Sequence, residues 1–202
     1  MGGSRERRKH PRLVLASASP RRRDLLEQAG YKFDLAKPAV EEISADWLTI
    51  RETTACNATR KAVAVARCTP DAVVLGADTL VSLDGYVIGK PADLASAAKI
   101  LQRLSGRSHE VWTSVFVCHW RTKRARSFQE ISRVIFHELD QSTIAHYLAK
   151  IDPLDKAGAY AAQGHGAEII ERIDGSYTNV VGLPMERTEE ILRMFGIEPT
   201  SR

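Results

Sequence analysis

The chain has 202 residues, of which 44% are hydrophobic and 27% are charged. These values are ordinary for a globular protein and exclude intrinsic disorder and collagen-like structure, while the length suits one domain. The net charge is only +4 and aromatic residues make up 6% of the chain. The basic residues gather at 5–12 and 121–126. Because no aromatic residues interleave regularly with these two clusters, a nucleic-acid-binding protein is the weakest functional class.

Residues 1–11 are basic, so we expect a flexible tail followed by a single domain over residues 12–202. The three cysteines, Cys56, Cys68 and Cys118, are widely spaced and form no CxxC pair. This usage is typical of reduced thiols in the cytoplasm rather than of a zinc site. We also expect no membrane partner, because no apolar run approaches the roughly 18 residues of a membrane helix. We expect no signal peptide, because the first ten residues lack an apolar stretch.

The chain alternates between patterns typical of strands and of helices. The first expected elements are a buried strand over 13–16, a helix starting at Ser19-Pro20 and ending at Gly30, an extended segment over 31–43, a helix over 54–68, a buried strand over 72–77, a hairpin over 80–88 that turns at Asp84-Gly85, and a helix over 94–104 capped by Asp93, with Leu94, Ala97, Ala98, Leu101 and Leu104 facing inward. The later ones are strands over 111–120 and 128–139, a helix over 140–150, an irregular segment over 155–166, a strand over 168–173, a turn at Asp174-Gly175 and a helix over 184–195. Alternating helices and strands together with hairpins predict an α/β protein with a mixed sheet.

The first candidate site is the helix start at Ser17, Ser19, Arg21 and Arg22. A helix N-terminus presents free amide groups and a partial positive charge, so arginines in its first turn are unfavourable unless an anion binds there. Amides, hydroxyls and guanidinium groups together suit a phosphate. The alternative is an ordinary Ser-Pro helix start with solvated arginines.

Acidic residues and lysines supply further candidates. Asp78 follows the buried run 72–77, and α/β proteins place ligand and metal groups at the ends of such strands. Of the adjacent Glu41 and Glu42, an extended chain would direct one inward, where it could hold a metal. Lys61 shares the inward side of its helix and therefore needs an anionic partner or must reach solvent.

Two loops complete the set. Lys90, in Gly89-Lys90-Pro91, is either a phosphate contact or a plain loop lysine. The segment 155–164, which contains Gln163, mixes charges, an amide and small residues as a binding loop does. Arginines, lysines, carboxylates and an amide suit a metal-bound polyphosphate. The sequence contains no HExxH, GxSxG, Walker A or Rossmann motif.

The chain resembles the Maf (septum formation) family of nucleoside triphosphate pyrophosphatases from about residue 13 to residue 195. The matching segments are LASASPRR at 15–22, GADT at 76–79, GKP at 89–91, DKAGAY at 155–160 and VGLP at 181–184. The resemblance implies a Maf/ITPase-like α/β fold, in which helices flank an elongated mixed sheet and a central cleft separates two lobes. It also implies hydrolysis of a nucleoside triphosphate to the monophosphate and pyrophosphate with Mg²⁺ or Mn²⁺, and a homodimer.

The resemblance also assigns roles to the candidate residues. It implies phosphate or substrate binding by Ser17, Ser19, Arg21, Arg22 and Gln163, catalysis by Asp78, Lys61 and Lys90, and metal binding by Glu42 and Asp78, with Glu41 left as an alternative to Glu42. Water activated by Asp78 would attack the α-phosphorus of the metal-bound triphosphate.

The DKAGAY segment followed by Gln163-Gly164 resembles the branch that acts on dTTP, UTP and modified pyrimidine triphosphates. Ala162 departs from that branch, where isoleucine is common. Two alternatives therefore stay open beside a dTTP/UTP pyrophosphatase. They are a 7-methylguanosine triphosphate pyrophosphatase and a nucleotide-binding regulator of cell division that does not catalyse turnover.

Overall fold

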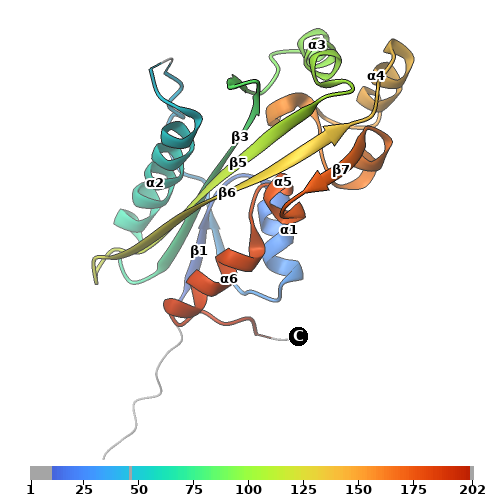
Figure 1. Ribbon diagram of the computed structural model, residues 1–202. Coiled ribbons are helices and arrows are strands. Elements are labelled where there is room, and N and C mark those ends of the chain that lie inside the picture. The colour runs from blue at the N-terminus through green and yellow to red at the C-terminus, as the bar shows by residue number, and fades with distance from the viewer. Residues whose placement is uncertain (1–10, 46, 201–202) are drawn as a thin grey trace, which may run out of the picture.

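The computed structural model describes residues 11–45 and 47–200. Residues 1–10 of the predicted tail lie outside this part of the chain. The described residues form a seven-stranded sheet of order β2-β1-β3-β5-β6-β7, with β4 paired to β3 (Figure 1). Its strands are β1 (Leu13–Ala16), β2 (Asp34–Ala36), β3 (Val73–Leu83), β4 (Tyr86–Ile88), β5 (Ser108–His119), β6 (Arg124–Phe136) and β7 (Ile170–Asp174).

The sheet is mixed, as the sequence predicts. β1 runs parallel to both β2 and β3, whereas β3 is antiparallel to β4 and β5, β5 to β6, and β6 to β7. The helices are α1 (Pro20–Gln28), α2 (Ile50–Cys68), α3 (Leu94–Leu104), α4 (Gln141–Leu148), α5 (Tyr177–Val181) and α6 (Met185–Met194), with 3₁₀ turns η1 (Ala157–Ala159) and η2 (Gly164–Glu168). The α/β prediction is therefore confirmed.

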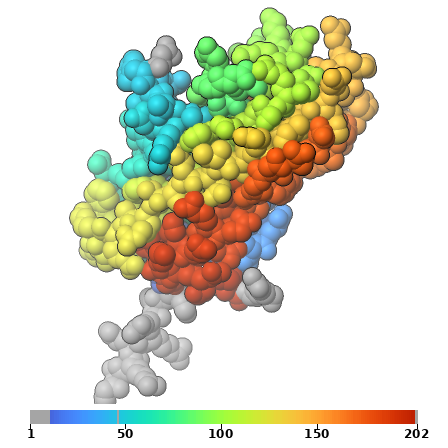
Figure 2. All heavy atoms as spheres, viewed as in Figure 1, coloured from blue at the N-terminus to red at the C-terminus, as the bar shows by residue number. Residues whose placement is uncertain are grey.

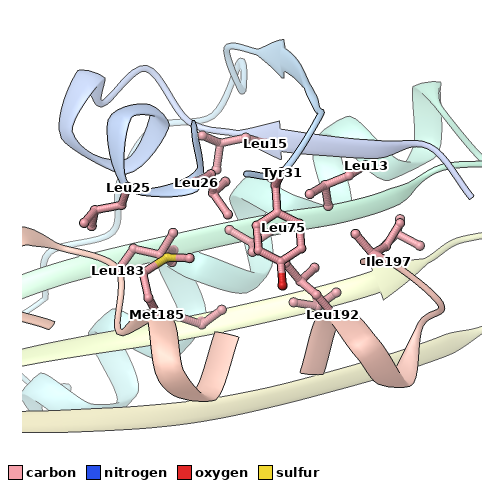
Figure 3. Packing of buried hydrophobic residues seen from close by; sticks show 14 of the residues in the cluster. Leu13, Leu15, Leu25, Leu26, Tyr31, Leu75, Leu183, Met185, Leu192 and Ile197 are labelled. Atoms are coloured by element: carbon pink, nitrogen blue, oxygen red, sulfur yellow. The ribbon is translucent and has the colours of Figure 1, made fainter. Parts of the chain in front are cut away.

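Helices cover both faces of the sheet, and Figure 1 shows α2 on the side opposite α1 and α6. Under α1 and α6, Leu26, Leu75 and Leu192 belong to one buried apolar cluster (Figure 3). A second cluster fills the space between α2 and the β1–β3 region. A third packs α3 and α4 against the far ends of β3, β5 and β6. The long β6 crosses the near surface from one end of the molecule to the other (Figure 2), so the sheet joins two lobes with separate cores.

Close contact between α2 and β3 depends on Gly76. A Cβ atom at this position would lie 2.6 Å from the Ala58 carbonyl oxygen and 2.8 Å from the Ala62 amide nitrogen. Both atoms are backbone and cannot move aside without shifting α2. We therefore expect Gly76→Ala to lower the free energy of unfolding by about 1–3 kcal/mol, the usual cost of overpacking.

Urea denaturation measures this loss. Gly89→Ala is the matched control, since a Cβ at Gly89 would meet open space. An unchanged stability in Gly76→Ala would contradict the close packing of α2 on β3.

Several predicted starts and ends shift for local reasons. α2 begins at Ile50 rather than at residue 54, because Thr49 and Glu52 form a reciprocal capping box before it. The predicted strand over 168–173 begins at Ile170, because the 3₁₀ turn η2 continues through Glu168. The helix caps at Ser19 and Asp93 are confirmed.

One further expectation is wrong, and one helix has no counterpart among the predicted elements. Leu94 does not face inward and is 58% exposed, since it is the first residue of α3 and lies outside the buried stripe of Ala97, Leu101 and Leu104. The short helix α5 does not follow from the apolar pattern, because five residues are too few to show a helical period.

Candidate functional site

A cleft of about 1260 Å³ lies beside β3 and the start of α1. Its wall contains every residue that the sequence proposes for the site: Ser17, Ser19, Arg21, Arg22, Glu41, Glu42, Lys61, Asp78, Lys90 and Gln163. These residues come from six separate stretches of the chain. Their common location is a finding of the structure, while their individual roles stay predictions.

The cleft exists because one edge of β3 is uncovered for a short distance. The parallel partner β1 ends where Ala16 pairs with Gly76, and pairing with the hairpin partner β4 starts only at Val81 of β3, opposite Ile88. Residues 77–80 therefore have a neighbouring strand, β5, on one side only. Asp78 thus lies inside a continuous strand and does not follow its end, which corrects the predicted strand end at residue 77.

Strand alternation directs Asp78 towards α2. It shares a face with Gly76, which contacts α2, whereas Thr79 faces the other side. A charged residue inside a strand is costly unless it has partners. Asp78 is only 5% exposed and has two: the Lys61 ammonium, 2.6 Å from Oδ1, and the Asn57 amide, 3.3 Å from Oδ2.

Lys61 is the central cation of the site. Its Nζ donates to Oδ1 of Asp78 at 2.6 Å and to Oε1 of Glu42 at 2.7 Å, and the residue is 8% exposed. Of the two alternatives for an inward lysine on this helix, an anionic partner or a path to solvent, the structure shows the anionic partner. One ammonium group holds two carboxylates that come from separate segments.

Glu42 is the more exposed member of the carboxylate pair. Partial burial raises its pKa, but the hydrogen bond and charge of Lys61, with the charge of Lys90, bring the pKa below its ordinary value. The Lys90 Nζ lies 3.7 Å from Oε2 of Glu42. Glu41 is exposed, and the segment that carries both residues is irregular rather than a strand. The structure thus directs Glu42, and not Glu41, to the central lysine.

Arg22 is built into the wall of the cleft. Its guanidinium donates to the Gly182 carbonyl at 2.8 Å, to the Ala77 carbonyl at 3.0 Å, and to the hydroxyl groups of Thr79 and Ser17. Burial lowers the pKa of Arg22 despite the opposing charge of Asp78. Arg22 therefore donates a hydrogen bond to a backbone carbonyl group at the uncovered edge of β3 and links this edge to the C-terminal end of α5.

Arg21 extends across the cleft to the loop that precedes η1. Its Nη1 donates to Oδ2 of Asp155 at 2.7 Å, and Asp155 also pairs with Lys156. Burial raises the pKa of Asp155, but the hydrogen bonds from Lys156 and Arg21 leave the pKa below its ordinary value. The contact brings the loop that leads to Gln163 towards the helix start.

Ser17 shapes the same helix start. Its hydroxyl oxygen accepts a hydrogen bond from the Ser19 amide at 3.1 Å, while Ser19 is the N-cap residue and makes no side-chain cap bond. The Ser19 hydroxyl therefore remains available to a ligand at the cleft wall.

Asn57 and Thr79 belong to the site but are not predicted from the sequence. Asn57 lies one helical turn before Lys61, so the i, i+4 relation alone places it on the same side of α2. Thr79 bonds to Arg22 and shares a 2.9 Å hydroxyl contact with Thr113. A polar residue one turn from a buried lysine was the available signal for Asn57.

The two carboxylates at Lys61 offer a divalent cation an incomplete set of protein ligands. Among residues 11–45 and 47–200, no group of three or more His, Cys, Asp or Glu side chains could bind a metal. Mg²⁺, however, commonly uses one or two carboxylates and takes its other ligands from water and substrate phosphates. Glu42 and Asp78, gathered at one ammonium group, fit that pattern.

A family model described as Maf-like protein matches residues 12–195. The chain belongs to the Maf family. A relative from Pelotomaculum thermopropionicum, named dTTP/UTP pyrophosphatase, is 47% identical over 91% of this chain and 96% of its own length. A Maf relative of the same name from Bacillus pumilus is 45% identical over 93% of this chain and 98% of its own length.

The Staphylococcus aureus Ham1 protein has a similar fold. It aligns with 91% of this chain and 98% of its own length, with a TM-score of 0.53 and 15% identity. The predicted Maf/ITPase-like fold is therefore confirmed. Within the described part of this Maf chain, no helix is long and apolar enough to cross a bilayer.

Proposed function

We propose that this Maf chain is a nucleoside triphosphate pyrophosphatase that hydrolyses dTTP and UTP to the monophosphate and pyrophosphate. The observation that carries the proposal is the cleft in which a buried carboxylate, Asp78, lies among cations from three segments. The two relatives at 45–47% identity are named dTTP/UTP pyrophosphatase, and this chain aligns with nearly their full length. Modified pyrimidine triphosphates are further candidate substrates.

Glu42 and Asp78 would hold Mg²⁺ or Mn²⁺ in this site. A bound cation of this kind polarises phosphate oxygens and neutralises developing negative charge. The chain's own contribution is to bring the two carboxylates together at the Lys61 ammonium group.

Side chains of the protein would activate the water molecule and stabilise the leaving group. Asp78 would orient a water molecule and accept its proton for in-line attack on the α-phosphorus. Lys61, Lys90 and Arg21 would stabilise charge on the leaving pyrophosphate. Arg22 would add its positive charge from within the wall, because most of its donors already bond to protein atoms.

Ser17 and Ser19 would offer phosphate contacts beside the α1 N-terminus. Gln163 lies in the cleft wall, in the loop region that follows Asp155, and would bind the nucleotide from there. The hydrogen bond from Arg21 to Asp155 holds this region near the start of α1. An amide presents both a donor and an acceptor, which suits the edge of a pyrimidine base.

Pyrophosphate release from a nucleotide panel tests this function. The panel contains dTTP, UTP, CTP, dCTP, GTP, 7-methylguanosine triphosphate and modified pyrimidine triphosphates, each with and without Mg²⁺ or Mn²⁺. Metal-dependent release that favours dTTP and UTP is the expected result. A preference for 7-methylguanosine triphosphate would contradict the assigned base. Tight binding without release would favour the nucleotide-binding regulator.

The proposal includes a cytoplasmic homodimer that does not bind nucleic acid. Sedimentation at several protein concentrations tests the dimer. Duplex or single-stranded nucleic acid should not compete with dTTP, whereas competition that weakens steeply with salt would contradict this part of the proposal.

The metal assignment predicts different effects for two adjacent glutamates. Glu42→Gln should lower pyrophosphate release by about 10- to 100-fold and raise the Mg²⁺ concentration needed for half-maximal rate, because it removes a charged oxygen ligand. Glu41→Gln is the matched control and should change both quantities less than about twofold, because Lys61 pairs with Glu42 and not with Glu41. Reversed effects would transfer the metal ligand to Glu41.

A further inference from the structure

We propose that Asn57 is a positioning residue that fixes Asp78 and the Glu42 segment around Lys61. The inference rests on the proposed function, since it concerns how the two carboxylates are held for a divalent cation. Asn57 is 3% exposed and lies on the buried side of α2. It belongs neither to the phosphate contacts nor to the charged groups already assigned.

All three hydrogen bonds of the Asn57 amide join separate parts of the chain. Its Oδ1 accepts from the Ile43 amide nitrogen at 2.8 Å, and its Nδ2 donates to the Ile43 carbonyl at 3.1 Å. The same Nδ2 donates to Oδ2 of Asp78 at 3.3 Å. One side chain thus fastens the irregular segment after β2 to α2 and connects both to β3.

The consequence for the carboxylates follows from their neighbours. Ile43 directly follows Glu42, so the paired bonds to its backbone fix the chain where Glu42 reaches Lys61. Asp78 has one oxygen on Lys61 and the other on Asn57, which fixes the orientation of its carboxylate plane. If a ligand drew Lys61 away from the pair, Asn57 would still hold both segments.

Removing such support typically costs 10- to 100-fold in metal affinity or activity. Asn57→Leu has a similar size and abolishes all three bonds, and Asn57→Ser is a milder variant that retains a short hydroxyl. Thr54→Val is the matched control. Thr54 is fully buried one turn earlier on α2, and its hydroxyl group hydrogen-bonds to Ser114 and Gln129 rather than to Asp78 or Ile43.

The experiment compares the full-length wild type with these three variants. Mn²⁺ binding is measured on nucleotide-free protein from the electron paramagnetic resonance signal of free Mn²⁺, and kcat and KM are measured with dTTP. Urea denaturation gives the stability of each variant. We expect Asn57→Leu to weaken Mn²⁺ binding and lower kcat/KM by about 10- to 100-fold, with a smaller loss in the same direction for Asn57→Ser. Thr54→Val should lose stability but stay within about twofold in both quantities.

Equal Mn²⁺ affinity and kinetics in Asn57→Leu, Asn57→Ser and Thr54→Val would overturn the inference and leave the pyrophosphatase assignment intact. A wild type that binds Mn²⁺ but releases no pyrophosphate from any nucleotide would instead refute the proposed function. The Mn²⁺ affinities of the variants would then still decide whether Asn57 positions the carboxylates.

Discussion

Asp78→Asn is expected to lower pyrophosphate release by about 10³-fold or more, because it removes the proposed proton acceptor and a metal ligand in one step. The amide has the same shape as the carboxylate, so its oxygen can still accept from Lys61. The far-ultraviolet circular dichroism spectrum and the two-state unfolding transition should therefore be retained. The measurement is single-turnover release from dTTP at saturating Mg²⁺.

A loss of catalysis alone would not separate chemistry from folding, so the fold must be checked in the same preparation. Asp140→Asn supplies a matched control, since Asp140 caps α4, is absent from the cleft wall and accepts a hydrogen bond from the Thr143 amide. It should retain full activity and lose at most about 1 kcal/mol of stability. Turnover close to wild type in Asp78→Asn would refute the catalytic assignment.

Lys61→Met should have the largest effect on stability. Methionine retains much of the length and apolar volume of lysine, but the buried Asp78 carboxylate would lose the cation 2.6 Å away. Removing one partner of a buried ion pair usually costs about 3–5 kcal/mol, because the other charge stays buried. Urea denaturation of wild type and variant measures this loss, and pyrophosphate release should fall as well, because a charge that would stabilise the leaving group is missing.

Divalent cations provide a second readout on Lys61→Met. In the wild type, Lys61 already balances the two carboxylates, whereas in the variant Glu42 and Asp78 have no shared cation. Mg²⁺ should therefore raise the Tm of Lys61→Met more than the Tm of the wild type, since a ligand that binds the folded state more tightly stabilises it more at the same concentration. Equal shifts would show that the carboxylates do not act as a pair.

The pH dependence of the stability difference has a definite sign. In the folded wild type, Lys61 and Lys90 bring the pKa of Glu42 below its ordinary value in spite of partial burial. A carboxylate of this kind adds stability above its unfolded-state pKa of roughly 4.3, and this stability is lost as the pH falls through the folded-state pKa. The deficit of Lys61→Met should therefore be greatest near neutral pH and narrow under acid. A deficit that grew on acidification would contradict the ion pair.

Local chemistry in the sequence predicts much of the fold. The Asp84-Gly85 pair predicts the β3–β4 hairpin, and both residues adopt the positive φ that such a turn requires. Asp93 and Asp140 cap their helices as their side chains allow. Thr49 and Glu52 have the spacing of a capping box, which predicts the observed start of α2 at Ile50. The alanine pattern alone indicates a later start.

The candidate site is predictable in its residues but not in its arrangement. Aspartate is disfavoured in strands, so Asp78 suggests a strand end, and only its contacts with Lys61 and Asn57 explain why the strand continues. The sequence predicts that Arg22 is free to contact a phosphate, because its hydrogen-bond partner Gly182 lies 160 residues further along the chain. Contacts over such separations depend on the assembled sheet, which no local pattern specifies.

Hydrolysis of dTTP in ¹⁸O-labelled water tests the central claim most directly. Attack on the α-phosphorus places the label in thymidine monophosphate and leaves pyrophosphate unlabelled. We predict this labelling pattern with Mg²⁺ or Mn²⁺. For Asp78→Asn we predict that almost no labelled thymidine monophosphate forms in the same time. Label in pyrophosphate, or release of inorganic phosphate as the first product, would contradict the proposed reaction.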